Sequence, residues 1–339
     1  MNFLIDFLIC SIFAIAIAYW FKKKNILIHN VGEFHQSFIK SNPTPLAGGI
    51  IIFFYILVHF KSLSPVYIFP FLILLTGIFS DSKTIKSAYF RLFIQLILVV
   101  LFISIYNLNL NSTRIIYLDE FLRNYYFSVF FTSLCVLIVI NGTNFIDGSN
   151  LLTIGYFVIL EIAFLHLKNK GILLDNNIFS FSLLPVLIVI FIFNSFNKIY
   201  LGDAGSYLLG FIYSFKCISL YLTNNDISPF FIVLILWYPG FEIFFSILRK
   251  LNFNRSPIKP DSNHLHQLIY LSLYKKINKN EIRSNLVGLI INTFNLSIFF
   301  FSLKDIYNSQ YQIILLLISI FVYVFIYVKL LRSKLKNKF

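Results

Sequence analysis

Charged residues are scarce in this chain of 339 residues: Asp, Glu, Lys and Arg together make up 12%. A water-soluble domain carries roughly a quarter charged residues, because its surface must be solvated. Cysteine is rare as well, and Cys10, Cys135 and Cys217 each lie inside an apolar run. This placement excludes a disulfide framework and a cysteine-based metal site, and it is typical of small buried side chains. The composition therefore argues against a soluble globular protein.

Apolar residues take the place of charge: they form 58% of the chain and include 42 Phe. They occur in runs of about 15 to 20 residues, the length of a helix that crosses a bilayer. The first run, 3–21, is followed by Lys22, Lys23 and Lys24 and not by a small-residue cleavage site, so we expect a retained helix. The pattern predicts an all-α polytopic membrane protein with one integral-membrane domain, 1–339. The predicted helices are 3–21, 48–60, 66–80, 91–106, 126–140, 151–167, 179–194, 204–222, 230–248, 284–303 and 312–331, eleven in all.

The basic residues are distributed unevenly between the two sides that eleven crossings define. One set of connections, together with the C-terminal tail, holds 21 Lys and Arg residues, and the opposite set holds six. Cytoplasmic loops are enriched in Lys and Arg, which predicts an N-terminus outside and a C-terminus in the cytoplasm. The net charge of +14 then follows from topology; it suits anionic lipid headgroups and substrate phosphates and requires no nucleic acid. The predicted cytoplasmic loops are about 22–47, 81–90, 141–150, 195–203 and 249–283.

Five polar segments interrupt the apolar pattern, and all five lie on the predicted cytoplasmic side. The first, KSNPTPLAGG (40–49), begins with Lys40 and contains a turn rich in proline and glycine. Such a turn exposes backbone N–H groups that suit an anion, although an ordinary helix entry has the same composition. The shared side of the five segments indicates a single active site.

The second segment, SDSKTIKSAYFR (80–91), follows the third predicted helix. It places Asp81 at the membrane boundary, where a carboxylate is costly unless it is solvated or used. Lys83, Lys86 and Arg91 are candidates to pair with Asp81 or to hold phosphate. The alternative is an ordinary charged loop.

The third segment, NGTNFIDGSN (141–150), follows the fifth predicted helix. Asn141, Asn144 and Asp147 are three residues apart, so they share one face of a helical turn. Amides and a carboxylate on one face donate and accept in a fixed pattern, which suits a nucleobase or a sugar. The alternative is that these residues cap a helix. Capping accounts for one of the three residues better than it accounts for all three.

Two further segments complete the set. In LGDAGS (201–206), Asp203 is flanked by small residues that let a metal-bound phosphate approach the backbone, so it is the best candidate for an Mg²⁺ ligand. A helix-capping aspartate at a glycine turn is the competing interpretation. In SPIKPDSNHLHQ (256–267), His264 and His266 flank a leucine, and zinc binding lacks a nearby third ligand. Phosphate or nucleotide contacts are the preferred interpretation.

Carboxylates also occur inside the apolar runs. Glu242 lies within WYPGFEIFF of the ninth predicted helix, where an acid usually faces a bundle interior or a water-filled cavity. Glu161 and Lys216 raise the same question but lie closer to the outer half, where long side chains reach the interface. The sequence leaves open whether Glu242 serves catalysis or packing.

Taken in order, NGTNFIDG, LGDAGS and PDSNHLHQ resemble the motifs of the polyprenyl-phosphate N-acetylhexosamine-1-phosphate transferase superfamily, over about Lys40 to Gln267. This superfamily, glycosyltransferase family 4, includes the phospho-MurNAc-pentapeptide translocase and the initiating transferases of O-antigen and teichoic acid. The resemblance implies a helical bundle around a cytoplasm-facing cleft in the bacterial inner membrane. It also implies transfer of a sugar-1-phosphate, an N-acetylhexosamine-1-phosphate, from a UDP-sugar to undecaprenyl phosphate, with release of UMP.

Further expectations follow from the same resemblance. Mg²⁺ is the expected cofactor, with Mn²⁺ as the alternative, and homodimerisation is left open. The reaction would be the first membrane step in the synthesis of a cell-surface glycan, such as O-antigen of lipopolysaccharide, capsule or a cell-wall polymer. By motif, the implied catalytic residues are Asp81, Asp203, His264 and His266, the implied metal ligand is Asp203, and the implied substrate-binding residues are Lys40, Asn141, Asn144 and Asp147.

The chain departs from the family pattern at several positions, which include Leu46 in place of a basic residue and Asn150 in place of an acidic residue or glycine. The family commonly has two neighbouring carboxylates where Asp81 stands between Ser80 and Ser82, and Gln267 occupies the place of a common third histidine. These departures leave a catalytically impaired member, one that binds nucleotide sugar or scaffolds glycan assembly, as the alternative function. A transporter or flippase is a second alternative, but such proteins place their sites near the bilayer midplane and in paired halves.

Overall fold

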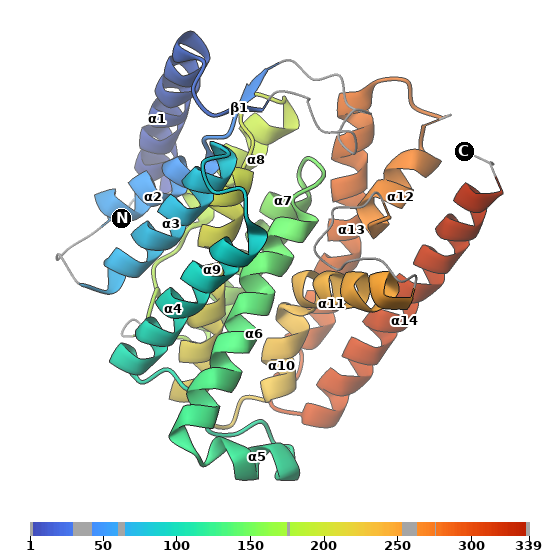
Figure 1. The fold of residues 1–339 in the computed structure, drawn as a ribbon. Helices are drawn as coiled ribbons and strands as arrows, with labels where there is room; N and C mark the ends of the chain where they lie inside the picture. The colour runs from blue at the N-terminus through green and yellow to red at the C-terminus, as the bar shows by residue number, and fades with distance from the viewer. Residues whose placement is uncertain are drawn as a thin grey trace.

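The computed structural model describes residues 3–29, 43–59, 65–174, 177–252, 263–274 and 276–336. Within these ranges the chain forms fourteen α-helices, the 3-10 helix η1 (Pro65–Tyr67) and an antiparallel pair of strands, β1 (Ile28–His29) and β2 (Thr44–Pro45). The helices are α1 (Phe3–Lys24), α2 (Gly48–Val58), α3 (Ile68–Asp81), α4 (Ala88–Tyr106), α5 (Ile116–Leu122), α6 (Tyr125–Ile146), α7 (Leu152–Asn169), α8 (Leu184–Ser195), α9 (Gly202–Thr223), α10 (Pro229–Ile235), α11 (Trp237–Asn252), α12 (Leu265–Ser272), α13 (Asn280–Ser302) and α14 (Ser309–Leu335). The described part of the chain is therefore a helical assembly (Figure 1).

Each predicted apolar run contains a helix, but the ninth, 230–248, is not continuous. The structure divides it into α10 and α11, which are bent by 75° relative to one another. Pro239 explains the break, because its ring has no N–H to donate to the carbonyl of Ile235 and would clash with that carbonyl in a straight helix. The short helices α5 and α12 are additional to the prediction.

The long apolar helices agree with the predicted fold class. Among the described residues, six helices are long and apolar enough to cross a membrane, namely α1, α4, α6, α7, α13 and α14, and the bent pair of α10 and α11 raises this to seven if it forms one span. α2, α8 and the η1–α3 segment are shorter apolar helices. The protein is thus an all-α, multi-pass membrane protein, and the count of eleven crossings stays a prediction.

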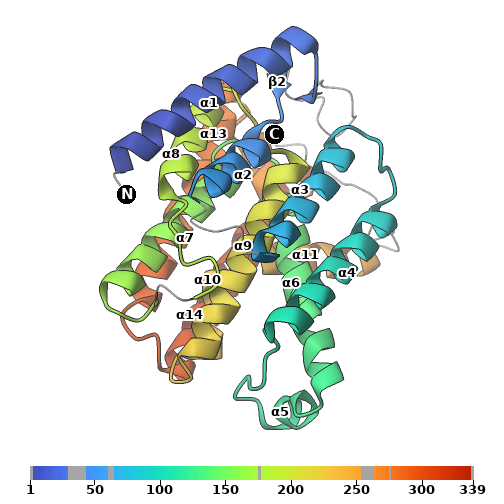
Figure 2. The same cartoon turned by 90° about the vertical axis from the view of Figure 1, so that its left-hand side faces the viewer.

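Helix α9 lies at the centre of the bundle, and nearly all of its side chains are buried. Two glycines allow its first turn to be approached closely by neighbouring helices. A Cβ on Gly49 of α2 would lie 2.5 Å from the backbone N of Gly205, and a Cβ on Gly77 of α3 would lie 2.3 Å from the Cα of Ala204. Figure 2 shows α2 and α3 beside α9. The N-terminus of α9 is therefore surrounded by other helices and not by lipid.

Polar loops gather at two ends of the bundle. At one end, next to α5, Arg114 donates to the backbone carbonyls of Asp226 (2.7 Å) and Tyr307 (3.2 Å), joining three loops of the predicted outer side. At the other end, the side chain of Asn150 donates to Asn197 Oδ1 (2.6 Å), joining two predicted cytoplasmic loops. Figure 1 shows α5 at the lower end and β1 and α12 near the upper end. Which side of the membrane either end faces stays a prediction.

Candidate functional site

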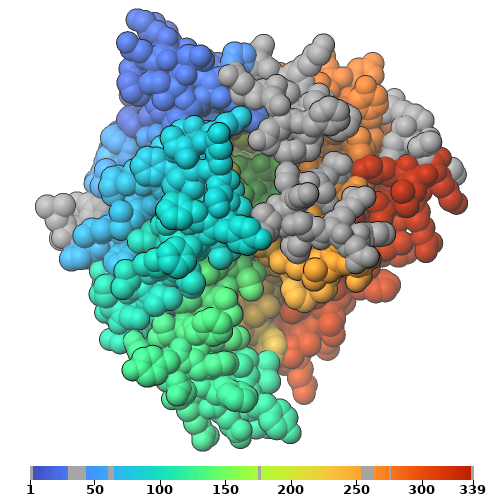
Figure 3. All heavy atoms as spheres, viewed as in Figure 1, coloured from blue at the N-terminus to red at the C-terminus, as the bar shows by residue number. Residues whose placement is uncertain are grey.

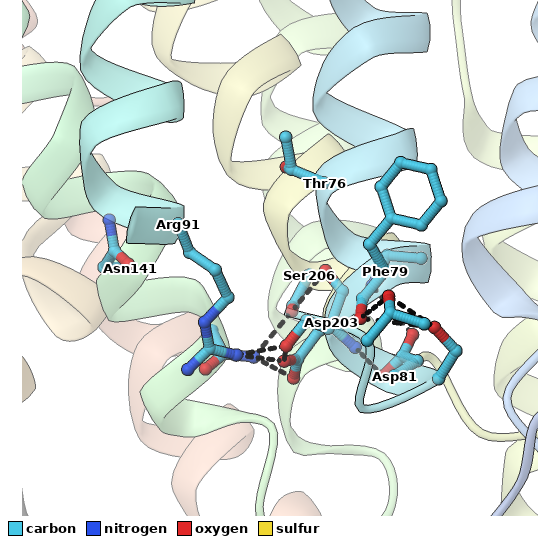
Figure 4. A network of polar contacts seen from close by, with 12 residues as sticks. Thr76, Phe79, Asp81, Arg91, Asn141, Asp203 and Ser206 are labelled. Atoms are coloured by element: carbon cyan, nitrogen blue, oxygen red, sulfur yellow. Dashed lines mark hydrogen bonds and ion pairs between the residues drawn. The ribbon is translucent and has the colours of Figure 1, made fainter. Parts of the chain in front are cut away.

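The carboxylate of Asp203 is the meeting point of four helices. Asp203 is the second residue of α9 and follows Gly202, whose φ of +73° lets the chain turn sharply into the helix. Its Oδ2 accepts hydrogen bonds from the hydroxyl of Ser80 in α3 and from Arg91 Nη1 in α4 (3.0 Å). Its Oδ1 accepts from Asn144 Nδ2 in α6 (2.6 Å). Figure 4 shows Arg91 reaching toward Asp203, so segments from three other helices hold one carboxylate.

Asp81, the last residue of α3, holds the same turn from the other side. Its two carboxylate oxygens accept the backbone N–H groups of Asp203 (2.9 Å) and Ala204 (3.1 Å). Leu201, at the N-cap position of α9, provides no capping side chain, so Asp81 caps α9 from a neighbouring helix. Burial and the negative charge of Asp203 raise the pKa of the Asp81 carboxyl, and the two backbone hydrogen bonds oppose this shift. These contacts thus give Asp81 a positioning function, and its implied catalytic role stays a prediction.

The third polar segment divides between two sets of contacts. Asn144 donates to Asp203 and also approaches Ser206 Oγ (3.1 Å). Asn141, one turn earlier in α6, donates instead to Gln95 Oε1 of α4 (2.9 Å). The shared helical face brings Asn144 to the centre of the site, whereas Asn141 braces α4 against α6. Its predicted contact with substrate remains untested.

Asp147 follows the last residue of α6, and the charge of Asp203 affects the pKa of its carboxyl. Burial raises the pKa of the Asp147 carboxyl to about 7, and the negative charge of Asp203 acts in the same direction. Near neutral pH this carboxyl is therefore partly protonated, so it both accepts and donates hydrogen bonds. Such a group is suited to the hydroxyl or amide of a sugar.

The histidine segment packs against the turn that carries Asp147. His266, in α12, is buried, and its Nε2 lies so close to Gly148 that a Cβ there would be 2.2 Å away. Glycine at 148 is therefore required by this approach. The ring of His264 meets the ring of Phe145 edge-on, with centroids 5.5 Å apart, and stacks on His266 at 5.6 Å. The third and fifth polar segments are thus in direct contact.

His266 is a neutral imidazole at physiological pH. Burial lowers its pKa to about 4, and the positive charge of His264 lowers it further, although the carboxylate of Glu242 opposes this. A neutral ring has one donor and one acceptor nitrogen. Its Nδ1 is buried and has no hydrogen-bond partner among the described residues. This nitrogen suits a hydrogen bond to a ligand or to a residue outside those ranges.

The first polar segment supports the turn before Asp203. The backbone N–H of Tyr200 donates to Pro45 O (3.0 Å), and the N–H of Gly48 donates to Tyr200 O (3.0 Å). The hydroxyl of Thr44 donates to Asn197 O (3.0 Å). These bonds tie the proline-glycine turn to the loop 197–201. Lys40, predicted to bind substrate, lies outside the described residues.

The five polar segments therefore meet around Asp203 and the Asp147–Gly148 turn. In the space-filling view of Figure 3 the surface is hollowed beside the cyan segment, and green atoms form the floor of the hollow. From the sequence, Ser80 had no predicted place in the site, and Arg91 was expected either to pair with Asp81 or to hold phosphate. Both contact Asp203 instead. The only sign of this contact in the sequence was Arg91 itself, which stands at the start of the helix that follows Asp81.

The donor groups fit a magnesium ion. Among the described residues, no group of three or more His, Cys, Asp or Glu side chains is arranged to hold a metal. Mg²⁺ needs no such cage, because it takes one or two carboxylates and completes its shell with water and substrate oxygens. Within the described ranges, Asp203 Oδ1 accepts from Asn144 alone, which leaves a lone pair, and the Asp203 side chain is 29% exposed. Asp203 therefore suits a metal ion that is shared with a phosphate ligand.

Comparison with known proteins identifies a matching family. Residues 63–221 match the model of glycosyl transferase family 4. The chain is 32% identical over 205 residues to the probable undecaprenyl-phosphate N-acetylglucosaminyl 1-phosphate transferase of Bacillus subtilis, covering 58% of this chain and 55% of that protein. It is 27% identical over 254 residues to the undecaprenyl-phosphate alpha-N-acetylglucosaminyl 1-phosphate transferase of Salmonella typhimurium, covering 71% of this chain and 67% of that protein.

A third relative covers less of the chain. The decaprenyl-phosphate N-acetylglucosaminephosphotransferase of Mycolicibacterium smegmatis is 27% identical over 161 residues, which are 41% of this chain and 39% of that protein. The chain thus spans about half the length of the first curated relatives it matches. The matched range 63–221 includes Asp81, Asp147 and Asp203. Over residues 63–221 the chain is thus similar to glycosyl transferase family 4, and the curated relatives are by name polyprenyl-phosphate N-acetylglucosamine-1-phosphate transferases.

Proposed function

We propose that this protein is an enzyme that transfers an N-acetylhexosamine-1-phosphate from a UDP-sugar to undecaprenyl phosphate and releases UMP. The observation that carries the proposal is the convergence of Ser80, Arg91 and Asn144 on one partly exposed carboxylate, Asp203. The names of the relatives support a polyprenyl-phosphate acceptor and an N-acetylglucosamine-1-phosphate group. The product would begin the assembly of a cell-surface glycan.

The reaction joins two anions, so charge must be neutralised before they meet. The electrophile is the β-phosphorus of the UDP-sugar, and the nucleophile is a phosphate oxygen of the lipid. When bound at Asp203, Mg²⁺ would neutralise charge on the diphosphate. Arg91 adds a guanidinium at the same carboxylate, and Asn144 keeps the carboxylate oriented. Asp81 holds the first turn of α9 in place, so that Asp203 keeps its position during turnover.

Direct attack by the lipid phosphate is the favoured chemistry. A phosphate monoester has its second pKa near about 6, so the acceptor is largely ionised at neutral pH and needs no strong base. Both oxygens of Asp81 already accept backbone N–H groups, which suits a positioning role better than a nucleophilic one. Trapping a phosphorylated Asp81 after incubation with the UDP-sugar alone would contradict direct attack.

The location of the site suits a reaction between a water-soluble donor and a lipid acceptor. The polar segments lie at one end of the bundle, where a headgroup meets water. The excess of 21 over six Lys and Arg residues supports a cytoplasmic orientation of that end in the bacterial inner membrane. We propose an external N-terminus and a cytoplasmic C-terminus. Cysteine labelling of intact cells at position 198 would contradict this orientation if a membrane-impermeant reagent reacted there.

The test of the function is a reconstituted assay. Purified protein is mixed with undecaprenyl phosphate, Mg²⁺ and each of a panel of UDP-sugars, and UMP release is measured with and without EDTA. We expect release with at least one UDP-N-acetylhexosamine, loss with EDTA and recovery with Mg²⁺ or Mn²⁺. Asp203→Asn is expected to abolish turnover while membrane insertion is retained. Near-normal activity of this variant would refute the metal assignment, and silence of the wild type with the whole panel would refute the proposed activity.

A further inference from the structure

Glu242 is a buried carboxylate that the proposed mechanism does not use. It lies in α11, and its side chain is 1% exposed. Its Oε1 lies 2.9 Å from His264 Nδ1, and its Oε2 accepts the hydroxyl of Tyr323 in α14 (2.6 Å). Both oxygens are therefore engaged, as a buried carboxylate requires. Three segments far apart in the sequence meet at this one side chain.

The partners distinguish Glu242 from the other deeply buried glutamate. Glu161 pairs with Lys216 (2.9 Å) and accepts from Tyr213 (2.5 Å), and these residues all lie within helices α7 and α9. In the part of the chain that the structure describes, the hydrogen bonds of Glu161 and Lys216 join no polar segment of the site. Glu242, in contrast, bonds to a histidine of the fifth polar segment. A packing role explains the contacts of Glu161, but it does not explain why Glu242 bonds to a histidine of the site.

An ionised carboxylate accepts hydrogen bonds and does not donate them. Nδ1 of the His264 ring therefore donates to the Glu242 carboxylate, and any contact of this ring with a phosphate is made through Nε2. The edge of Phe145 limits rotation of the ring from the other side, at a centroid distance of 5.5 Å. The preceding residue, Asn263, accepts from Lys334 Nζ of α14 (2.7 Å). The orientation of the His264 ring and the position of the preceding residue, Asn263, are thus both restrained by contacts.

We propose that Glu242, supported by Tyr323, is a positioning residue that fixes the ring orientation and the protonated nitrogen of His264 for the transfer reaction. This inference rests on the proposed function. It also assigns α11 and α14, which lie outside the family-matched range 63–221, a part in building the site. The bend between α10 and α11 then acquires a reason, because it turns α11 so that Glu242 reaches the histidine segment.

The test is a double-mutant cycle on turnover. Glu242→Gln, His264→Asn and the double variant are assayed for UMP release with the donor that the wild type uses. If Glu242 acts through His264, Glu242→Gln lowers kcat by about 10- to 100-fold, as for carboxylates behind metal-bound histidines. KM for the UDP-sugar changes by less than about twofold, and the double variant is no slower than His264→Asn alone. Multiplied losses in the double variant would overturn the inference.

Matched variants separate positioning from folding. Glu242→Asp keeps the charge and is expected to retain more activity than Glu242→Gln. Tyr323→Phe removes one bond to the carboxylate and is expected to cost roughly 2- to 10-fold. The control is Tyr221→Phe, which removes a buried hydroxyl bond to Ser112 O (2.9 Å) at the opposite end of the bundle and is expected to leave kcat unchanged.

The outcomes also separate the two proposals. Thermal unfolding in detergent is measured for every variant, and if Glu242→Gln does not reach the membrane, Tyr323→Phe replaces it in the cycle. A wild type that releases no UMP with any donor overturns the proposed function and this inference together. An active wild type in which Tyr323→Phe and Tyr221→Phe behave alike overturns the inference alone.

Discussion

Replacing Asp81 with asparagine tests whether this residue caps α9. In the native protein one carboxylate accepts two backbone N–H groups, those of Asp203 (2.9 Å) and Ala204 (3.1 Å). Asparagine keeps a single acceptor oxygen and turns an NH₂ group toward the second N–H. The substitution therefore breaks one hydrogen bond and leaves one backbone donor unpaired.

The magnitude follows from the unpaired donor. A buried donor without a partner costs about 1–3 kcal/mol, so Asp81→Asn should lower the free energy of unfolding by about that amount. Asp203→Asn provides the comparison, because the ion pair of Asp203 with Arg91 involves side chains that are 29% and 24% exposed. Such a pair contributes at most about 1 kcal/mol.

The assay compares the two variants in stability and in turnover. Both are expected to lose UMP release, Asp203→Asn through the metal ligand and Asp81→Asn through the displaced turn. Asp81→Asn is expected to show a lower unfolding midpoint in detergent than the wild type. An Asp81→Asn protein that is inactive yet as stable as the wild type would refute the capping role and would favour direct participation of Asp81 in the chemistry.

Three further predictions concern the surroundings of Asp203 and the histidine segment. Arg91→Gln removes a charge-assisted bond to Asp203 and should lower kcat/KM for UMP release by roughly 10- to 100-fold; a rate near that of the wild type would exclude Arg91 from the site. Gly148→Ala places a Cβ 2.2 Å from His266 Nε2 and should destabilise the protein by about 1–3 kcal/mol with loss of turnover; an active, stable variant would contradict this contact. The pKa of His266 falls from 6.5 to about 4 on folding, because the ring is buried and next to His264. The unfolded chain therefore binds the extra proton between these pH values, so stability is unaffected above pH 6.5 and falls by about 3 kcal/mol as the pH drops toward 4. Unfolding midpoints measured from pH 7.5 downward should show this slope in the wild type and a smaller one in His266→Gln; equal slopes would refute it.

The sequence by itself determined the membrane class, the positions of the apolar helices and the identity of the polar segments. A helix that crosses a bilayer makes its backbone hydrogen bonds within itself and remains apolar over its length. Each such helix therefore appears in the sequence as one continuous apolar run. The same constraint makes polar residues conspicuous where they interrupt the pattern. Asp203, Asn144 and the two histidines were found in this way.

The tertiary structure decided which polar groups touch. The sequence did not show that Ser80 and Arg91 would join Asp203, that Asp81 would cap α9, or that Asn141 would turn to Gln95. Asp81 and Asp203 are 122 residues apart, and their contact depends on how closely α3 packs on α9, which the close approach at Gly77 permits. Local composition specifies a helix, but a contact between helices depends on side-chain packing and on crossing geometry along their whole length, which no single stretch of sequence contains.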